Sequence, residues 1–474
     1  MFPRAPLLAL LLGSACGEPQ AVAPLVLVFS WDTTRADALG AYAAESHWGL
    51  DLPPDQRPRP QTPAADQLAA EGVRFSWALA HAPTTLNSHA SIFSGRDPHG
   101  HGVPRNGFRL PDNVPTLPER ASAAGWATIG VAGASVLAEE TGISRGFDIW
   151  DATFEKKVRH RYERTCGEVI ARLLHHLETV PPERPVFAFA HCFDAHSPWE
   201  SAPEELRRSF GLPGYQGAVN GSSAAMDFLV KTARAGALGT ADRRQARALY
   251  LAEVAAQDAA LARLLTQLGA RDRDLRLVLL GDHGEALEEI PTRAYGHGLD
   301  VGLVSIHVPL IFWGKGAAQL APRVVDHPVG LWSVAPTLAT WMGLGPIGQG
   351  PDLSAYLLGD PASPAAVPHF AEATKPGTDG PGPWNNLGLA RGVVANGRLR
   401  LRDPRLGEQG LYALAPGQPP LSDEGVATQL DSLLGAWDAA APPAALPQLS
   451  SEAEGALRAL GYLDGPLAPA QPPP

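Results

Sequence analysis

Acidic and histidine side chains follow three apolar segments of the chain, at the point where each segment ends. In chain order these side chains are Asp32, then His191, Asp194 and His196, then Asp282 and His283. A single Asp after a strand is usually a turn former or a helix cap. Carboxylates and imidazoles are also common protein ligands of divalent metal ions. Three such groups that converge on one place favour a shared metal site over three separate turns.

The three segments predict buried strands, because each is a continuous run of apolar residues. They span residues 25–29, 186–190 and 277–280, and a fourth run covers residues 308–312. In the fourth run, Pro309 indicates that the strand begins there or lies at a sheet edge. Helical patterns separate the runs, over residues 64–71, 116–124, 166–177 and 243–268. This alternation predicts an α/β fold, a mostly parallel central sheet with helices on both faces. Ligands of such sheets bind beyond the carboxyl ends of the strands, where these polar groups would meet.

The C-terminal part of the chain has a different pattern. Residues 392–402 form two short runs around Asn396-Gly397, which is typical of a β-hairpin. Residues 411–414 predict a further strand and residues 426–437 a helix. The expected organisation is an α/β catalytic domain over residues 25–365, a smaller antiparallel subdomain over residues 366–462 and a disordered Pro-rich tail over residues 463–474.

Composition excludes two classes of protein. Hydrophobic residues make up 45% of the 474 and charged residues 18%, as in globular proteins, so the chain is not disordered throughout. The 38 Lys and Arg against 49 Asp and Glu give a net charge of −11 without a basic block, so we expect no nucleic-acid partner. An anionic ester could still bind where a local cation holds it.

Residues 1–15 have the form of a secretory signal, with Arg4 before an apolar run that is too short to span a membrane. The small residues that lead into Cys16 resemble a bacterial lipoprotein box, and plain signal cleavage is the alternative. We therefore expect an exported protein of the bacterial cell envelope, in the periplasm or anchored by a lipid on Cys16. No transmembrane helix is predicted. Whether Cys166 and Cys192 pair stays open.

With these residues in view, the chain resembles the sulfatase family, within the alkaline-phosphatase-like superfamily. The resemblance is carried, in order, by Asp32-Thr33-Thr34-Arg35-Ala36-Asp37, Ser88-His89-Ala90-Ser91, Asp194-Ala195-His196-Ser197-Pro198-Trp199 and Gly281-Asp282-His283-Gly284-Glu285. It implies a metal-dependent ester hydrolase in which Asp32, Asp282 and His283 hold a divalent metal ion. Thr85 Oγ would be a further ligand. The metal would be Ca, Zn or Mn, as one ion or two.

The departures from the family pattern concern the nucleophile and the groups that bind the anion. The family has a Cys, oxidised to formylglycine, in a Cys-x-Pro-Ser-Arg core. Here Thr85 stands at the Cys position and His89 at the Arg position. Thr33 replaces the usual second metal Asp, and the family's anion-binding Lys and a His of its second motif are missing.

Formylglycine cannot be made from Thr, so the usual sulfatase chemistry is not open to this chain. Related branches of the superfamily, nucleotide phosphodiesterases and lipid-headgroup transferases, use a metal-bound Thr as nucleophile. A Thr hydroxyl becomes a good nucleophile once a metal or base lowers its pKa. The helix expected from Ser88 would place Thr85 just before its N-terminus, where the helix dipole favours negative oxygens. An ordinary helix-start residue is the alternative. The motif context favours Thr85 as the nucleophile.

Histidines complete the predicted site. By the resemblance, His196 contacts the non-bridging oxygens of the ester or protonates the leaving group, and His297 complements it. His89 would hold the anion in place of the lost Arg when it is protonated. Asp194, His196 and His297 form an alternative second metal site. His191 is expected to be structural.

Three functions fit these features. The predicted one is a sulfatase-like, metal-dependent hydrolase that acts on a sulfate or phosphate ester of a small molecule, a glycan or a lipid. A phosphodiesterase or headgroup transferase that uses the same Thr is the first alternative. Transferases of this kind usually carry several transmembrane helices, which disfavours them here. The second alternative is a catalytically inactive relative that binds an anion or a glycan, since three anion-site residues of the family are missing.

Overall fold

The computed structural model describes most of the chain. The described residues are 23–45, 52–53, 57–154, 162–269, 273–289, 295–360, 367–374, 390–403, 408–415, 419–441, 450 and 455–456. The expected signal segment, Cys16 and the expected Pro-rich tail lie outside these residues and stay predictions. None of the described helices combines the length and the apolar character that crossing a membrane requires.

An eight-stranded sheet forms the centre of the molecule, in the order β12-β2-β11-β7-β1-β6-β4-β5. In that order the strands are β12 (Arg323–Val325), β2 (Val73–Phe75), β11 (Leu310–Lys315), β7 (Leu275–Gly281), β1 (Leu25–Trp31), β6 (Val186–Cys192), β4 (Ala127–Val131) and β5 (Ile149–Asp151). Strand β11 is antiparallel to both of its neighbours, whereas the other pairings are parallel. The predicted mostly parallel sheet is therefore confirmed.

Strand β11 begins at Leu310, directly after Pro309, as one reading of the sequence required. It does not lie at an edge, because β2 and β7 pair with its two sides. Pro309 precedes the ladder, where its missing N–H costs no strand hydrogen bond and its carbonyl accepts from Gly281 N–H at 3.1 Å. The edge interpretation of this proline was wrong.

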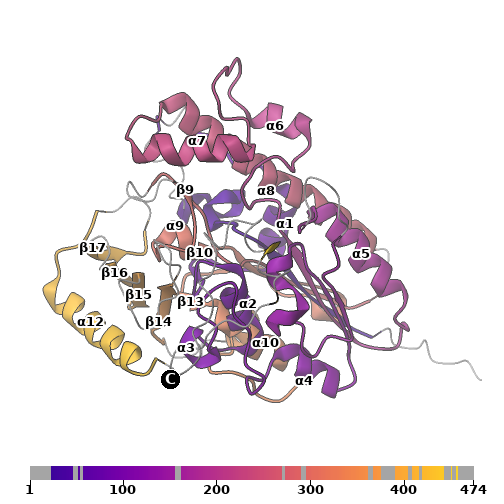
Figure 1. The fold of residues 1–474 in the computed structure, drawn as a ribbon. Helices are drawn as coiled ribbons and strands as arrows, with labels where there is room; N and C mark the ends of the chain where they lie inside the picture. The colour runs from indigo at the N-terminus through magenta and orange to yellow at the C-terminus, as the bar shows by residue number, and fades with distance from the viewer. Residues whose placement is uncertain are drawn as a thin grey trace, which may run out of the picture.

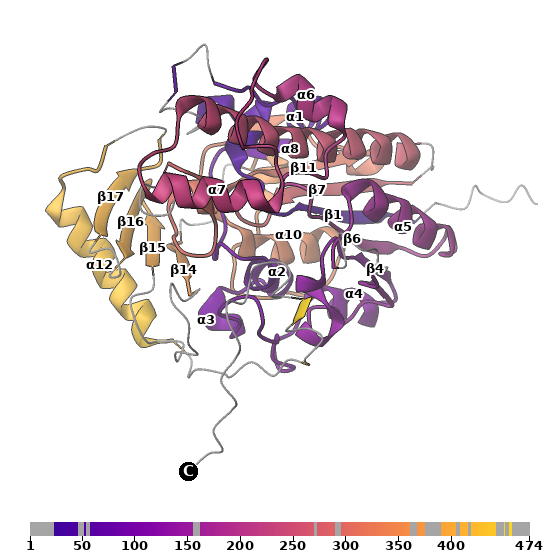
Figure 2. The same cartoon turned by 45° about the horizontal axis from the view of Figure 1, so that its top comes forward.

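Helices cover both faces of the sheet, as predicted, and Figure 2 shows the strands between the two helical layers. One layer contains α1 (Pro63–Glu71), α5 (Cys166–Glu178) and α8 (Thr240–Gly269), and the other contains α2 (Thr85–Ser94), α4 (Leu117–Ala123) and α10 (Val334–Trp341). Side chains of β1 alternate between the layers: Leu25 and Leu27 pack into the first core, Val26 and Val28 into the second. A strand buried on both sides must be apolar at every position, which explains the continuous apolar runs.

Two helices start where the sequence supplies reciprocal caps. Thr116 and Glu119 form a capping box at the start of α4, and Thr165 and Glu168 form one at the start of α5. Each box satisfies backbone N–H groups that the first turn leaves without partners and contributes about 1 kcal/mol. These caps explain why α4 and α5 begin within one residue of their predicted starts.

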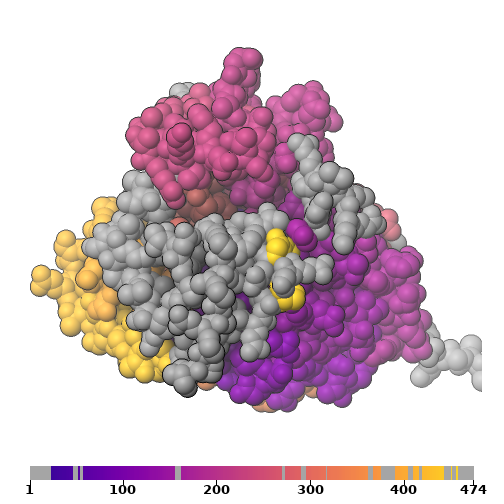
Figure 3. All heavy atoms as spheres, in the orientation of Figure 1, coloured from indigo at the N-terminus to yellow at the C-terminus, as the bar shows by residue number. Residues whose placement is uncertain are grey.

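Smaller elements surround the carboxyl ends of the central strands. Two short sheets are formed by β10 (His307–Val308), β3 (Ala78–Leu79) and β13 (Val329–Gly330), and by β8 (Ala286–Leu287) and β9 (Tyr295–Gly296). Three short helices are α3 (Pro98–His101), α9 (Leu303–Ile306) and α11 (Ser354–Leu358). Helices α6 (Glu204–Phe210) and α7 (Ser223–Arg234) lie in residues 204–234, here called the α6–α7 lobe, which Figure 3 shows as a raised block on the molecule.

The C-terminal part forms a separate antiparallel sheet in the order β14-β15-β16-β17, beside which Figure 1 shows helix α12. These elements are β14 (His369–Ala373), β15 (Ala390–Ala395), β16 (Arg398–Asp403), β17 (Glu408–Ala413) and α12 (Glu424–Ala439). Asn396 and Gly397 have φ values of 51° and 69°, the left-handed conformations that an Asn-Gly hairpin turn requires. The predicted hairpin is confirmed, and β14 adds a strand that the sequence analysis missed. The expected domain boundary at residue 365 falls outside the described residues and stays a proposal.

Candidate active site

The ends of β1 and β7 bring two carboxylates and an imidazole together. Trp31 and Gly281 are paired at the ends of these strands, so Asp32 and Asp282 follow at the same level. Ligand atoms of Asp32, Asp282 and His283 all lie within 4.8 Å of one another. His283 Nε2 is 3.6 Å from Asp282 Oδ2 and 4.0 Å from Asp32 Oδ1, and all three side chains are fully buried. The structure therefore assembles the three predicted metal ligands.

The hydrogen bonds of these residues show that the cluster fits a cation. His283 Nδ1 lies 3.0 Å from the carbonyl of Gly284 and must donate its proton there, so Nε2 carries a lone pair. That lone pair faces two carboxylate oxygens. Within the described part of the chain, Asp32 Oδ1, Asp282 Oδ2 and His283 Nε2 have no hydrogen-bond partner. Burying three acceptors without a donor is costly, and a divalent cation between them would satisfy all three.

The electrostatics of the two carboxyl groups point to the same conclusion. Burial raises the pKa of Asp282, and the negative charge of Asp32 raises it further. Burial also acts to raise the pKa of Asp32, but the hydrogen bond from His191 and the neighbouring histidines bring it below its ordinary value. A bound cation would keep both carboxyl groups ionised, because its charge reverses the mutual repulsion.

Thr33, at the position of the family's second metal Asp, contributes through its backbone. Its N–H donates to Asp282 Oδ1 at 3.1 Å, and the N–H of His283 donates to the same oxygen at 2.8 Å. Thr33 adopts a left-handed conformation with φ of 50°, which is unusual for a β-branched residue. The turn after β1 thus fixes one oxygen of Asp282 and leaves the other for the cluster.

Thr85 begins helix α2 and is fully buried. The sequence predicted a helix from Ser88, and the helix starts three residues earlier, at Thr85 itself. Its first turn lies against the second metal motif: Ser88 Oγ donates to the carbonyl of Asp282 at 2.6 Å. His89 Nδ1 is 2.7 Å from the carbonyl of Thr85 and 3.7 Å from Asp282 Oδ2. The helix turn that Thr85 begins thus lies against the second metal motif, and the role of Thr85 as ligand and nucleophile stays a prediction.

His89 has both ring nitrogens bonded inside the protein. Nδ1 donates to the carbonyl of Thr85, so Nε2 accepts from Ser30 Oγ at 2.9 Å when the ring is neutral. Burial lowers the pKa of His89 to about 3, and His191 nearby lowers it too. A neutral, fully buried ring holds the first turn of α2 against β1. This geometry does not favour the predicted role of His89 as the cation that binds the substrate anion.

His196 and His297 lie beside the cluster, as predicted. The ring centre of His297 is 4.6 Å from that of His283 and 5.0 Å from that of His196. His196 donates from Nδ1 to the next residue's carbonyl and stacks on Phe193, and burial lowers its pKa to about 4. His297 Nδ1 is 3.0 Å from Glu285 Oε2. Glu285 had no role in the sequence analysis, and its carboxylate stabilises a positive charge on His297.

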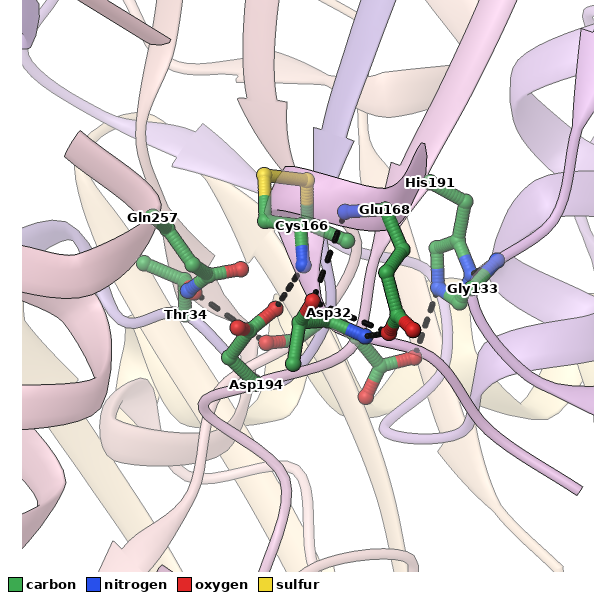
Figure 4. Close-up of a disulfide and its surroundings, with 10 residues drawn as sticks. Asp32, Thr34, Gly133, Cys166, Glu168, His191, Asp194 and Gln257 are labelled. Atoms are coloured by element: carbon green, nitrogen blue, oxygen red, sulfur yellow. Dashed lines mark hydrogen bonds and ion pairs between the residues drawn. A yellow bond between two sulfur atoms is a disulfide. The ribbon is translucent and has the colours of Figure 1, made fainter. Parts of the chain in front are cut away.

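His191, expected to be structural, contacts Asp32, one of the predicted metal ligands. The N–H of Gly133 donates to its Nδ1 at 3.3 Å, so the proton of the neutral ring sits on Nε2. Nε2 donates to Asp32 Oδ2 at 3.0 Å, as Figure 4 shows. This contact turns the other oxygen of Asp32 toward the cluster. His191 is the one histidine of strand β6. Its contact with Asp32 arises because β6 lies beside β1, which the sequence alone does not show.

The alternative second metal site is not formed. Among the described residues, two groups offer three ligand atoms within 4.8 Å, and neither contains Asp194, His196 or His297. The second group, His89 with His191 and Asp282, uses histidines whose nitrogens are already bonded. Asp194 Oδ2 instead accepts from the N–H of Cys166 at 2.8 Å, at the start of α5. Burial raises the pKa of Asp194 to about 7.

Cys166 and Cys192, whose pairing the sequence left open, form a buried disulfide between α5 and the end of β6. The carbonyl of Cys192 accepts from the N–H of Asp32 at 2.9 Å. Figure 4 shows Cys166, Asp194, Asp32 and His191 as one cluster around this bond. The disulfide therefore fixes the strand that carries His191.

Asn106 is a further residue that sequence reasoning missed. Its Oδ1 accepts from the N–H of Leu86, the residue after Thr85, at 2.8 Å. Its Nδ2 is buried and has no hydrogen-bond partner within the described ranges. A donor is thus held next to Thr85. In the sequence, Asn106-Gly107 is typical of a turn, so the pattern gave no sign that Asn106 contacts helix α2.

The arrangement agrees with a comparison against protein families. The family model described as Sulfatase matches residues 24–344, more than half of the chain. The chain therefore belongs to the sulfatase family, a family of ester hydrolases within the alkaline-phosphatase-like superfamily. A search of curated proteins finds no match.

Solved structures share the fold. BT4656, solved in complex with its substrate D-glucosamine-2-N,6-O-disulfate, is 17% identical, with a TM-score of 0.66, over 88% of this chain and 98% of that one. The phosphonate monoester hydrolase of Agrobacterium radiobacter is 19% identical, with a TM-score of 0.64, over 90% and 98%. The enzyme SpPMH from Silicibacter pomeroyi, of the same type, is 18% identical, with a TM-score of 0.63, over 88% and 94%. At these identities the likeness establishes the fold.

Proposed function

We propose that the protein is a metal-dependent hydrolase of sulfate or phosphate esters in which Thr85 Oγ is the nucleophile. One observation carries the proposal: three buried ligand atoms, which have no hydrogen-bond partner among the described residues, converge where helix α2 meets the ends of β1 and β7. The ligands would be Asp32, Asp282 and His283, with Thr85 completing the set. Two carboxylates and an imidazole suit Zn or Mn at least as well as Ca.

The chemistry follows from what each side chain can do. When bound, the cation lowers the pKa of the Thr85 hydroxyl and offsets the charge of the ester oxygens. Thr85 Oγ releases its proton to water and attacks sulfur or phosphorus, and the bond to the leaving oxygen breaks. His297 donates a proton to that oxygen and regains one from solvent. Glu285 supports the protonated state of His297. Water then hydrolyses the threonine ester, so the hydroxyl is regenerated and sulfate or phosphate leaves.

The ester oxygens need donors in place of the missing family Lys and Arg. The N-terminal turn of α2 supplies the positive end of a helix dipole at Thr85. Asn106 Nδ2 supplies a buried donor beside it. His196 lies next to His297 and would donate to the same oxygens only in its protonated form, because its Nδ1 already donates to the carbonyl of Ser197. A hydrogen bond from each donor stabilises the ester oxygens more strongly in this buried site than it would in water.

We infer a small-molecule, glycan or lipid ester as substrate, because the solved relatives act on a disulfated glucosamine and on phosphonate monoesters. The α6–α7 lobe is the candidate selector of the group attached to the ester. Helix α7 packs against β9, whose last residue precedes His297.

We also propose that the protein is exported to the bacterial cell envelope, either free in the periplasm or anchored by a lipid on Cys16. The signal-like residues 1–15 support export. The buried disulfide supports it independently, since such bonds persist in oxidising compartments.

The test is turnover of aryl sulfate, phosphate monoester, phosphate diester and phosphonate substrates with Zn, Mn or Ca. Wild type, Thr85→Ala and Thr85→Ser are compared at matched metal content. We expect hydrolysis of at least one class, a loss of at least about a thousandfold in kcat for Thr85→Ala and partial retention for Thr85→Ser. Turnover that Thr85→Ala leaves intact removes the covalent mechanism. An absence of turnover with every ester and metal favours the inactive, anion-binding alternative, and transfer to an alcohol acceptor favours the transferase.

A further inference from the structure

Two further histidines, His81 and His369, meet although they are far apart in the sequence. His81 follows strand β3, and His369 is the first residue of β14 in the C-terminal sheet. Their ring centres are 4.0 Å apart, with an angle of 42° between the planes. His81 is fully buried and His369 is 4% exposed. Two imidazoles from different parts of the fold are therefore enclosed together.

Hydrogen bonds fix which nitrogen of each ring holds the proton. His81 Nδ1 lies 2.8 Å from the carbonyl of Phe370, and His369 Nε2 lies 3.2 Å from the carbonyl of Ala80. A carbonyl only accepts, so each of these nitrogens donates. Burial lowers the pKa of His81 to about 3 and also lowers that of His369, so both rings are neutral. The second nitrogen of each ring therefore carries a lone pair.

The two lone pairs belong to His81 Nε2 and His369 Nδ1, and both are buried without a donor among the residues that the structure describes. They face the same point of strand β13. A Cβ at Gly330 would lie 2.4 Å from His369 Nδ1 and 2.7 Å from His81 Nε2. Only a glycine fits beside the two rings, because any side chain here would collide with both nitrogens. Gly330 and His369 also line a pocket, together with His327 and Ser333.

We propose that His81 Nε2 and His369 Nδ1 bind a transition-metal ion such as Zn²⁺, at a site separate from Asp32, Asp282 and His283. Imidazole lone pairs are preferred ligands of such ions. Histidines that ligate metals commonly donate their other N–H to a backbone carbonyl, as both rings do here. Ser333 Oγ, buried and without a partner within the described residues, and water from the pocket would supply further oxygen ligands. The ion would join β3 to the first strand of the C-terminal sheet.

The test compares zinc binding in wild type, His369→Gln and His175→Ala. The Gln variant keeps an N–H donor for the carbonyl of Ala80 but has no imidazole lone pair. His175→Ala removes an exposed histidine of α5 and is the control. After zinc loading and dialysis, we expect His369→Gln to hold one equivalent less than wild type and His175→Ala to match wild type. Crystals of the wild type should show an anomalous zinc peak between the two rings.

Gly330→Ala provides an independent variant, because its methyl group would press against both lone pairs and block a ligand there while both histidines stay. It should also lose one equivalent. The same measurements in an Asp282→Asn background separate this site from the candidate active site, since the loss on His369→Gln should persist there. An ordered water between the rings in zinc-loaded crystals overturns the proposal. Equal zinc content in wild type and His369→Gln overturns it as well, whatever the outcome of the activity assays.

Discussion

His191 Nε2 donates to Asp32 Oδ2 at 3.0 Å, and the N–H of Gly133 holds the opposite nitrogen of the same ring. The tautomer of His191 is thereby set by the backbone, and one oxygen of Asp32 is occupied. The remaining oxygen faces His283 Nε2 at 4.0 Å. A residue on β6 thus orients Asp32, a proposed metal ligand that follows β1, so we assign His191 as a positioning residue.

Loss of that hydrogen bond should weaken metal binding. We expect His191→Ala to raise the Kd for the active-site metal by about 10- to 100-fold, the usual effect of removing such a contact. His191→Gln retains an N–H donor and should recover most of the affinity. Metal titration of both variants, with His175→Ala as the control, measures the effect. Affinity that is equal in all four proteins would show that Asp32 needs no support from β6.

Asn106 should matter for turnover more than for metal binding. Asn106→Ala removes a buried donor beside Thr85, and we expect kcat/KM to fall by about 10²- to 10³-fold. Asn106→Asp places a negative charge near the ester oxygens and should be at least as damaging. Metal content should remain as in wild type. Steady-state kinetics with the best substrate class provide the measurement, and an unchanged kcat/KM for Asn106→Ala would contradict this role.

Asp194 should make stability depend on pH. Burial raises its pKa from 3.8 to about 7, so the folded chain holds the proton more tightly than the unfolded chain does. Its contribution to the free energy of unfolding is complete below about pH 4 and is lost as the pH rises to about 7. Asp194→Asn keeps an acceptor for the N–H of Cys166 but does not titrate. Across that range the free energy of unfolding of wild type should fall by a few kcal/mol relative to the variant.

Urea unfolding of the metal-free proteins at several pH values gives this comparison. Asp258 also has a raised pKa, but it is common to both proteins and cancels in the difference. The raised pKa of Glu253 depends in part on the charge of Asp194, so Glu253 adds to the fall in stability of wild type relative to the variant. Parallel pH profiles for wild type and Asp194→Asn would contradict the assignment.

The disulfide should stabilise the fold without being needed for metal binding. Cys166 and Cys192 are separated by 26 residues in the sequence, and a cross-link of that length contributes about 3 kcal/mol. The double variant Cys166→Ala/Cys192→Ala should lose about that much free energy of unfolding. The N–H of Asp32 bonds to a backbone carbonyl, which the variant keeps, so metal affinity should change by less than about fivefold. Equal stability of the variant and oxidised wild type would be the opposing result.

The sequence predicted that Asp32, Asp282 and His283 cluster, because this cluster depends on one local rule, polar residues after buried parallel strands. Asp32, Asp282 and His283 follow that rule, and strand order then places them together. Pro309 shows that a proline near a strand does not by itself place the strand at a sheet edge. A proline just before the first paired residue is compatible with a strand that has a neighbour on each side. The apolar runs and the helical patterns that separate them were enough to predict the fold class.

The rest of the site depends on contacts between residues that are remote in the sequence. His191 meets Asp32 only because β6 lies beside β1, and Asn106 meets Leu86 through a loop whose Asn-Gly pair is typical of a turn. His81 and His369 come together only when the C-terminal sheet docks against β3. No local pattern encodes such pairings, so a sequence taken alone does not reveal them.

The most direct measurement of the central claim is the site of covalent attachment during turnover. Wild type is mixed with excess ester in the presence of metal, quenched with acid within the first turnovers, digested and analysed by mass spectrometry. We expect one sulfuryl or phosphoryl group on the peptide that contains Thr85, located on Thr85 itself and absent from Thr85→Ala. Steady turnover with no modified Thr85 at any quench time, or with the group on another residue, would contradict the account.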